Sequence, residues 1–327
     1  MLGAMGGWSF MWRAGVCLAV GALSAVGCQQ PVASTPPPSR IVMSIPFGGA
    51  WEQIGRALTA EYGRRIPGLT AEASMATSLE AQADAIQSGS VDIALEDAET
   101  AYLAYTRGTA SQPSAHDGLR AISVMFSIAV QIAVPERAGI TSIDQLKGKR
   151  VDVGAPGSSV DRAARIILES YGLSYDAVTP TFGASDALAQ FKSGSVDARF
   201  FYSAFKHPTI DAISRDVDLR VLPIDRTRLG AIQERHHFLK LTTIPAGTYP
   251  HQPSDIQTVG MDVLLLCRKE LPEPLVYALT KALFESVPQL ERAHEAAGAI
   301  DVERAPTASI PLHAGAARFY REREILQ

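Results

Sequence analysis

The sequence has few cysteines, no long basic run and, after its N-terminus, no long apolar run. Of the three cysteines, Cys17 and Cys28 lie in an N-terminal stretch that we expect to be processed, which leaves Cys267 without a partner for an internal disulfide. Cys267 ends the apolar run VLLLC and is expected to be a small buried hydrophobic residue. The formal net charge of −4 and the lack of a basic run argue against nucleic acid as a partner. After the N-terminus, no apolar run approaches the roughly 18 residues that a membrane-spanning helix needs.

Signatures of catalysis and of metal binding are also missing. The motif LKGKR contains the Gly-Lys pair of a phosphate-binding loop, but Arg150 follows it and Gly139 is the only glycine near enough upstream. The sequence contains no HExxH motif, and Cys267 has no cysteine partner for zinc. Neither Ser158 nor Ser159 is followed by the second glycine of a nucleophile elbow. We therefore predict that the protein is not an enzyme and has no catalytic residues, no bound metal and no cofactor.

Residues 1–28 have the pattern of an export signal. Arg13 is the only charged residue, and an apolar run from Ala14 to Val26 follows it and ends in small residues. Cys28 comes next, in a context that resembles the signal of bacterial lipoproteins, where such a cysteine is acylated and becomes the new N-terminus. We therefore expect lipidation at Cys28 and a location in the periplasm or at the cell surface. A plain cleaved signal peptide and an uncleaved anchor are the alternatives.

Residues 29–39, QQPVASTPPPS, are predicted to be a linker. They contain four prolines and no charged residue. Such a segment stays extended and would reach about 34 Å in the polyproline conformation. The linker would hold a folded domain away from the membrane surface.

The pentapeptide SGSVD occurs twice, at residues 88–92 and 193–197. Apolar residues at helical spacing precede each copy, and a strand-like run follows it. Gly89 and Gly194 lie where a helix would end in the left-handed conformation that glycine adopts most readily. Each copy therefore predicts a helix, a glycine stop and a strand. Together they predict an α/β protein with two lobes built alike.

Two long apolar runs, at residues 121–135 and 259–270, predict strands that cross from one lobe to the other. The first lobe would then comprise residues 39–128 together with 262–327, and the second lobe residues 129–261. The amphipathic helical segment after the second crossing is expected to pack on the first lobe. Two lobes joined by two crossing strands make a hinge.

The segment DQLKGKRVDVGAPGS (144–158) resembles the start of the second lobe in many two-lobed periplasmic binding proteins. Three further segments are more specific: TTIPAGTYPHQPSDIQTV (242–259), LPEPLVYALTKALFE (271–285) and IPLHAGAARFYRE (310–322). They are similar to the TAXI family, the solute-binding subunits of one branch of the TRAP transporters. The resemblance implies a two-lobed periplasmic-binding-protein fold of type II-like architecture. It also implies a glutamate-like amino acid or a dicarboxylate as the solute and a TRAP membrane permease as the partner. From the signal before Cys28, we expect the lipid anchor to be the only attachment to the membrane. A substrate-binding protein of an ABC transporter and a ligand sensor for a membrane kinase are the alternatives.

In a two-lobed α/β protein, ligands bind in the cleft at the carboxyl ends of the strands. The segment FGGAW follows the first predicted strand, and its glycines would let the backbone approach a ligand. The segment GAPGSSVD follows a strand of the second lobe, and its serines could cap the next helix or bind an anion there. These segments contribute the candidate ligand-binding residues Gly48, Gly49, Trp51, Ser158 and Ser159.

The strands after the two SGSVD copies lead to further candidates. The first ends in Glu-Asp-Ala-Glu, so Asp97 and its acidic neighbours would either meet an ammonium group of the ligand or be solvated. The second presents Arg199 and Phe201 on one face and Tyr202 on the other. Arg199 would anchor a carboxylate or form a surface salt bridge. Tyr249, in the segment TIPAGTYP, belongs either to a structural loop or to the ligand site.

Overall fold

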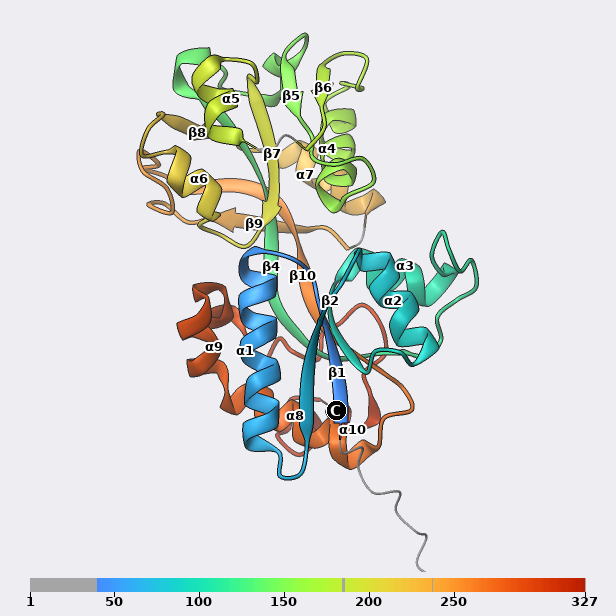
Figure 1. Ribbon diagram of the computed structural model, residues 1–327. Helices are drawn as coiled ribbons and strands as arrows, with labels where there is room; N and C mark the ends of the chain where they lie inside the picture. Colours follow the sequence, from blue (N-terminus) through green and yellow to red (C-terminus); the bar gives the residue numbers. More distant parts are fainter. Residues whose placement is uncertain (1–39, 184–185, 237, 327) are drawn as a thin grey trace, which may run out of the picture. The chain divides into compact units, whose positions relative to one another are not determined.

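Figure 1 shows the computed structural model, which describes residues 40–183, 186–236 and 238–326. The predicted signal peptide, the predicted linker and the predicted lipidation site Cys28 lie outside the described residues. Within these ranges, no helix combines the length and the apolar character of a membrane span. The described residues belong to one compact unit, so the predicted bounds of the two lobes stay a prediction.

The strands of the described residues form one ten-stranded sheet in the order β2-β1-β3-β10-β4-β7-β5-β6, with β8 beside β4 and β9 beside β10. Their bounds, in chain order, are β1 Arg40–Ile45, β2 Thr70–Met75, β3 Ile93–Asp97, β4 Leu119–Pro135, β5 Arg150–Asp152, β6 Thr179–Thr181, β7 Ala198–Ser203, β8 Leu219–Val221, β9 Lys240–Ile244 and β10 Ile256–Arg268. Helices and strands alternate along most of the chain, which confirms the predicted α/β class.

Each half of the sheet has the same plan. Strands β2, β1 and β3 run parallel, and β10 pairs with β3 in the antiparallel sense. Strands β6, β5 and β7 also run parallel, and β4 pairs with β7 in the antiparallel sense. The two SGSVD copies precede the equivalent strands β3 and β7. The repeat in the sequence therefore marks a repeat in the architecture.

The glycines of the two copies end their helices as predicted. Gly89 follows α2 (Leu79–Ser88) with φ 78° and ψ 10°, and Gly194 follows α5 (Ala187–Ser193) with φ 70° and ψ 19°. A residue with a side chain costs about 1 kcal/mol or more in this left-handed conformation. Both stops therefore need glycine.

The aspartates of the two SGSVD copies also make equivalent hydrogen bonds. Asp92 Oδ2 accepts the N–H of Val42 in β1 at 2.8 Å, and Asp197 Oδ2 accepts the N–H of Arg150 in β5 at 2.9 Å. In return, the Asp92 N–H donates to the Val42 carbonyl and the Asp197 N–H to the Arg150 carbonyl. Each aspartate thus ties the start of its strand to the neighbouring parallel strand. This shared contact explains why the two copies end in the same residue.

The two predicted crossing strands are β4 and β10, which pair with each other at the centre of the sheet. Both are almost entirely buried, including Cys267, which confirms its expected position in the core. The ladder is tight at Gly260, where an added Cβ would lie 2.4 Å from the Ile128 carbonyl oxygen and 2.6 Å from Thr242 Oγ1. Only glycine fits at this crossing without a shift of the backbone.

Helices cover the sheet, and the helical segment after β10 packs on the first half of the chain as predicted: α8 and α9 contact α1, and α10 contacts α8. Figure 1 shows these helices around β1 and β2. Besides α2 and α5, the helices are α1 Gly49–Arg65, α3 Ala98–Arg107, α4 Ser159–Ser170, α6 Pro208–Ile213, α7 Arg226–Arg235, α8 Glu273–Glu285, α9 Val287–Ala293 and α10 Ala314–Arg321, with 3-10 turns η1 Glu136–Ala138, η2 Ile143–Leu146 and η3 Glu295–Ala299.

Candidate functional site

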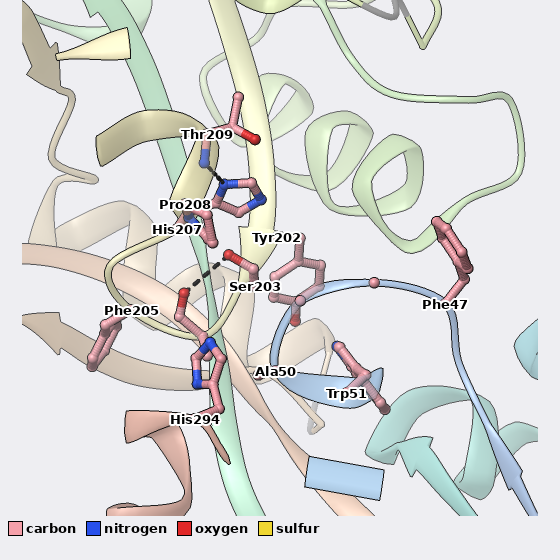
Figure 2. Close-up of a pocket in the computed structure, with 13 residues that line it drawn as sticks. Phe47, Ala50, Trp51, Tyr202, Ser203, Phe205, His207, Pro208, Thr209 and His294 are labelled. Carbon is pink, nitrogen blue, oxygen red and sulfur yellow. Dashed lines mark hydrogen bonds between the residues drawn. The ribbon is translucent and has the colours of Figure 1, made fainter. Parts of the chain in front are cut away.

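A cavity of about 410 Å³ lies between the start of α1 and the end of β7 (Figure 2), and we call it the α1–β7 cavity. Four residues predicted to bind ligand meet here, namely Gly48, Gly49, Trp51 and Tyr202. The residues that line it belong to the turn into α1, to the segment from β7 into α6, and to the start of η3: Phe47, Gly48, Gly49, Ala50, Trp51, Tyr202, Ser203, Ala204, Phe205, His207, Pro208, Thr209 and His294.

The turn into α1 forms one wall of the α1–β7 cavity. Gly48 and Gly49 have φ of 83° and 57°, and an added Cβ would meet no atom within 4 Å, so conformation rather than space requires glycine here. The Glu52 carboxylate accepts the Gly48 N–H at 3.1 Å and fixes the turn. The Trp51 ring packs edge-on against Phe126, with 6.1 Å between the ring centroids. The first turn of α1 therefore presents backbone N–H groups and the positive end of the helix dipole at the cavity.

Tyr202, at the end of β7, contributes to the opposite wall. Its hydroxyl is buried and has no hydrogen-bond partner among the described residues. Burial raises the pKa of Tyr202 well above its usual value, and the charges of Asp97 and Glu99 add to this effect. The hydroxyl therefore keeps its proton at neutral pH and can donate a hydrogen bond.

The two histidines of the cavity are neutral at physiological pH. Burial, together with a smaller effect of the charge of Arg199, lowers the pKa of His207 to about 4. Burial also lowers the pKa of His294. In both rings Nδ1 accepts a backbone N–H, from Thr209 for His207 and from Ala296 for His294, each at 3.1 Å. Sequence reasoning missed both residues, because a single histidine carries no motif.

Arg199 and Phe201 support the cavity without lining it. Arg199 forms an ion pair with Asp152 at 3.4 Å, and its guanidinium lies 5.3 Å from the Phe201 ring centroid. Asp152 is fully buried and the Arg199 side chain is only 18% exposed, so the predicted salt bridge is not at the surface. Phe201 is also buried, and its ring centroid lies 4.8 Å from that of His207. The predicted pairing of Arg199 and Phe201 on one strand face is confirmed.

Tyr249 lies in the core beneath this wall. It is 5% exposed, and its hydroxyl donates to Gln131 Oε1 and accepts the His207 N–H at 2.8 Å. The Gly247 N–H donates to the Gln252 carbonyl and closes the loop that carries Tyr249. Tyr249 thus holds the β7–α6 segment in place. Of the two roles predicted for Tyr249, a structural loop and the ligand site, this contact favours the structural loop.

Ser158 and Ser159 lie apart from the α1–β7 cavity, at a second cavity of about 510 Å³ beside the start of α4. Ser158 Oγ caps the helix by accepting the Asp161 N–H at 3.2 Å, and Asp161 accepts the Gly157 N–H at 2.9 Å. Ser159 Oγ donates to Asp97 Oδ2 at 3.0 Å. Much of the predicted anion-binding capacity of this helix start is therefore used by the protein itself.

The three acids at the end of β3 and the start of α3 are buried, so the alternative of a solvated acidic edge was wrong. Glu96 and Asp97 are fully buried and Glu99 is 7% exposed. Asp97 caps α3 by accepting the Thr100 N–H at 2.6 Å. Burial raises the pKa of Glu96 well above its usual value, and the charge of Asp97 raises it further. Acidic side chains are usually exposed to solvent, but each of these three has a hydrogen-bond or ion-pair partner in another segment of the chain.

Arg162, in α4, is the principal partner of these acids, and sequence reasoning missed it. Its guanidinium contacts Glu99 at 3.2 Å, approaches Asp97 at 3.9 Å, and hydrogen-bonds Ser159 Oγ at 3.3 Å. Burial lowers the pKa of Arg162, but the charges of Glu99 and Asp97 outweigh this and raise it above its usual value. The sequence did contain one sign of its position, because Arg162 lies about one helical turn after the predicted site residue Ser159 and residues at this spacing are neighbours on a helix.

No group of three or more His, Cys, Asp or Glu side chains in the described part of the chain is arranged to hold a metal ion. The α1–β7 cavity instead combines aromatic rings, a helix start and a buried hydroxyl, which suit an organic ligand.

Several solved structures share this architecture. The alkanesulfonate-binding protein SsuA from Xanthomonas axonopodis pv. citri, bound to MOPS, is 16% identical with a TM-score of 0.50 over 90% of this chain and 96% of that one. PhnD1 from Prochlorococcus marinus (MIT 9301), in complex with methylphosphonate, is 12% identical with a TM-score of 0.53 over 88% and 97%. XAC2383 from Xanthomonas citri, bound to ATP, is 14% identical with a TM-score of 0.51 over 88% and 100%.

At such identities the likeness shows the fold alone, and it confirms the predicted two-lobed periplasmic-binding-protein fold. The family follows from the sequence itself, since a model of the NMT1-like family matches residues 46–323. This match spans most of the chain, and the chain belongs to the NMT1-like family.

Proposed function

We propose that this protein is an extracytoplasmic solute-binding protein of a transporter, which holds a small polar organic solute in the α1–β7 cavity. The observation that carries the proposal is the cavity itself, formed by the start of α1 in one half of the fold and the end of β7 in the other. Carboxyl ends of strands and a helix start are where α/β folds bind ligands. The sulfonate, phosphonate and nucleotide in the similar structures support a small ligand.

The partner in this proposal is a TRAP membrane permease. The TAXI-like segments 242–259, 271–285 and 310–322 support it, and these imply a glutamate-like amino acid or a dicarboxylate as solute. The alternative is a permease of an ABC transporter, supported by the shared fold with the sulfonate-binding protein. Uptake by vesicles that contain the cognate permease separates the two: an ion gradient drives TRAP transport, whereas an ABC transporter requires ATP.

The mechanism in this proposal is hinge closure about β4 and β10. A solute that contacts both walls of the cavity favours the closed arrangement, because the open arrangement offers only one set of contacts. The contacts Ser159–Asp97 and Arg162–Glu99 also join the two predicted lobes. Lipidation of Cys28 would keep the protein at the outer face of the membrane. With a saturating solute, small-angle scattering should show a smaller radius of gyration.

The test of binding is a thermal-shift screen of about a hundred metabolites. A solute at 100 times its dissociation constant adds about 2.7 kcal/mol to the free energy of unfolding. The variant Trp51→Ala should lose the shift, and Phe182→Ala is the control, because this exposed ring does not line the α1–β7 cavity. A screen without any stabilising solute, or a shift that Trp51→Ala leaves unchanged, contradicts the proposed site.

A further inference from the structure

We infer that the solute of the α1–β7 cavity has a flat, largely apolar body and carries no more than one negative charge. This inference rests on the proposed function, because it takes the α1–β7 cavity as the solute site. It replaces the dicarboxylate or glutamate-like solute that the TAXI-like segments imply.

The lining of the cavity carries no charged side chain. Of its thirteen described residues, none is Asp, Glu, Lys or Arg. A buried carboxylate needs a cation or several hydrogen-bond donors to replace its water, and each further carboxylate needs its own. Arg199 was the predicted anchor, but it does not line the cavity and is engaged with the buried Asp152.

The histidines do not supply the missing charge. With their low pKa values, His207 and His294 are neutral at pH 7. Each ring also uses Nδ1 to accept a backbone N–H. Only the Nε2 atom of each ring remains for a ligand. Because Nδ1 accepts a hydrogen bond, the proton of the neutral ring is on Nε2. The pair therefore offers two neutral N–H donors, which suit polar groups and not a second full charge.

One anionic group does have a place. Glu52 accepts the Gly48 N–H, so the start of α1 offers a ligand the N–H groups of Gly49, Ala50 and Trp51, together with a partial positive charge equivalent to roughly half an elementary charge. The Tyr202 hydroxyl, buried and without a partner among the described residues, adds one donor on the opposite wall. These two features can hold a single carboxylate, sulfonate or similar group.

The remaining surface favours a flat body. The rings of Phe47, Trp51, Tyr202 and Phe205 all line the cavity, and Figure 2 shows them around it. Trp51 is held by its contact with Phe126, whereas Phe47 is 85% exposed and lies two residues after the end of β1. Aromatic walls bind planar groups by stacking and edge contacts. A cavity of about 410 Å³ has room for one or two rings.

The experiment is calorimetric titration of the full chain at pH 7.5 with three probes. Phenylacetate has one carboxylate and a ring, 1,4-phenylenediacetate adds a second carboxylate to the same ring, and glutarate has two carboxylates without a ring. We expect phenylacetate to bind at least tenfold more tightly than either diacid. Trp51→Ala should weaken phenylacetate at least tenfold, and Phe182→Ala should leave it unchanged.

Equal or tighter binding of either diacid overturns the inference and leaves the proposed function intact. If no probe binds, the solute found in the thermal-shift screen decides: a solute with two or more negative charges overturns the inference, and a planar monoanion or neutral ring compound supports it. If neither the probes nor the screen gives a solute, the proposed function itself fails, and the inference fails with it.

Discussion

Replacement of Arg162 by glutamine should lower the free energy of unfolding by about 2 kcal/mol at pH 8. Arg162 faces Glu99 and Asp97, whose side chains are only 9% and 0% exposed. Removal of one partner from a fully buried ion pair costs about 3–5 kcal/mol, whereas an exposed pair contributes about 0–1 kcal/mol. The Arg162 side chain is 31% exposed, which places the expected loss between these limits.

The loss should depend on pH, with a sign that follows from Glu99. Burial raises the pKa of Glu99, Arg162 opposes this, and Asp97 raises it further, so that the net pKa lies above the usual value of 4.5. A carboxyl group with a raised pKa binds its proton more readily in the folded state, and it therefore lowers stability as the pH rises above the unfolded value. Without Arg162 the pKa of Glu99 rises more. The penalty should therefore grow as the pH rises above the usual value of 4.5, and it should be larger at pH 8 than at pH 5.

Urea unfolding at pH 5 and pH 8 measures this effect. The control is Arg215→Gln, which breaks an ion pair of 2.7 Å with Asp211 one helical turn away, where the Arg215 side chain is 73% exposed. This control should show no measurable loss at either pH. Glu99→Gln, added to Arg162→Gln, should restore stability at pH 8, because it removes the uncompensated charge. Equal losses at the two pH values, or no recovery in the double variant, would refute the reasoning.

Gly260→Ala should lower the free energy of unfolding by about 2 kcal/mol, because its Cβ would lie 2.4 Å from a carbonyl oxygen of β4. Gly230→Ala, in an open position of α7, should raise the free energy of unfolding by about 0.5–1 kcal/mol. If urea unfolding finds Gly260→Ala as stable as Gly230→Ala or more stable, the tight packing at β4 and β10 is contradicted. Ser158→Ala should cost about 1 kcal/mol by loss of the α4 cap, and an unchanged melting temperature would show that the cap is dispensable. Cys28→Ala should move the protein from the membrane fraction to the soluble fraction, and a wild-type mature mass without lipid would exclude lipidation.

The sequence was sufficient for the parts of the fold that depend on local patterns. Gly89 and Gly194 mark helix ends by a conformation that one residue type adopts easily, and the apolar runs at residues 121–135 and 259–270 had to be buried strands. The meeting of Gly48, Gly49 and Trp51 with Tyr202 in one cavity was also within reach, because strand ends converge in an α/β fold.

Contacts between segments that are distant in the chain could not be predicted from the sequence. Arg162 meets Glu99 across 63 positions of the chain, and nothing around either residue indicates the other. For the same reason Arg199 was expected to anchor a carboxylate or to form a surface salt bridge, since its buried partner Asp152 lies in a different strand. The burial of Glu96 was missed because acids are usually exposed, and only the packing of α2 over β3, with Gln82 as hydrogen-bond donor at 3.2 Å, makes its position possible.

The position of β10 has a consequence for how the chain is made. This strand lies between β3 and β4 in the sheet, yet it is the last strand to emerge from the ribosome. The inner edge of β3 stays without its neighbour until residues 256–268 have been synthesised, and a late, long-range pairing of this kind slows folding. A nascent chain with the predicted export signal must remain unfolded until it has crossed the membrane. The strand order itself delays folding until nearly the whole polypeptide is available.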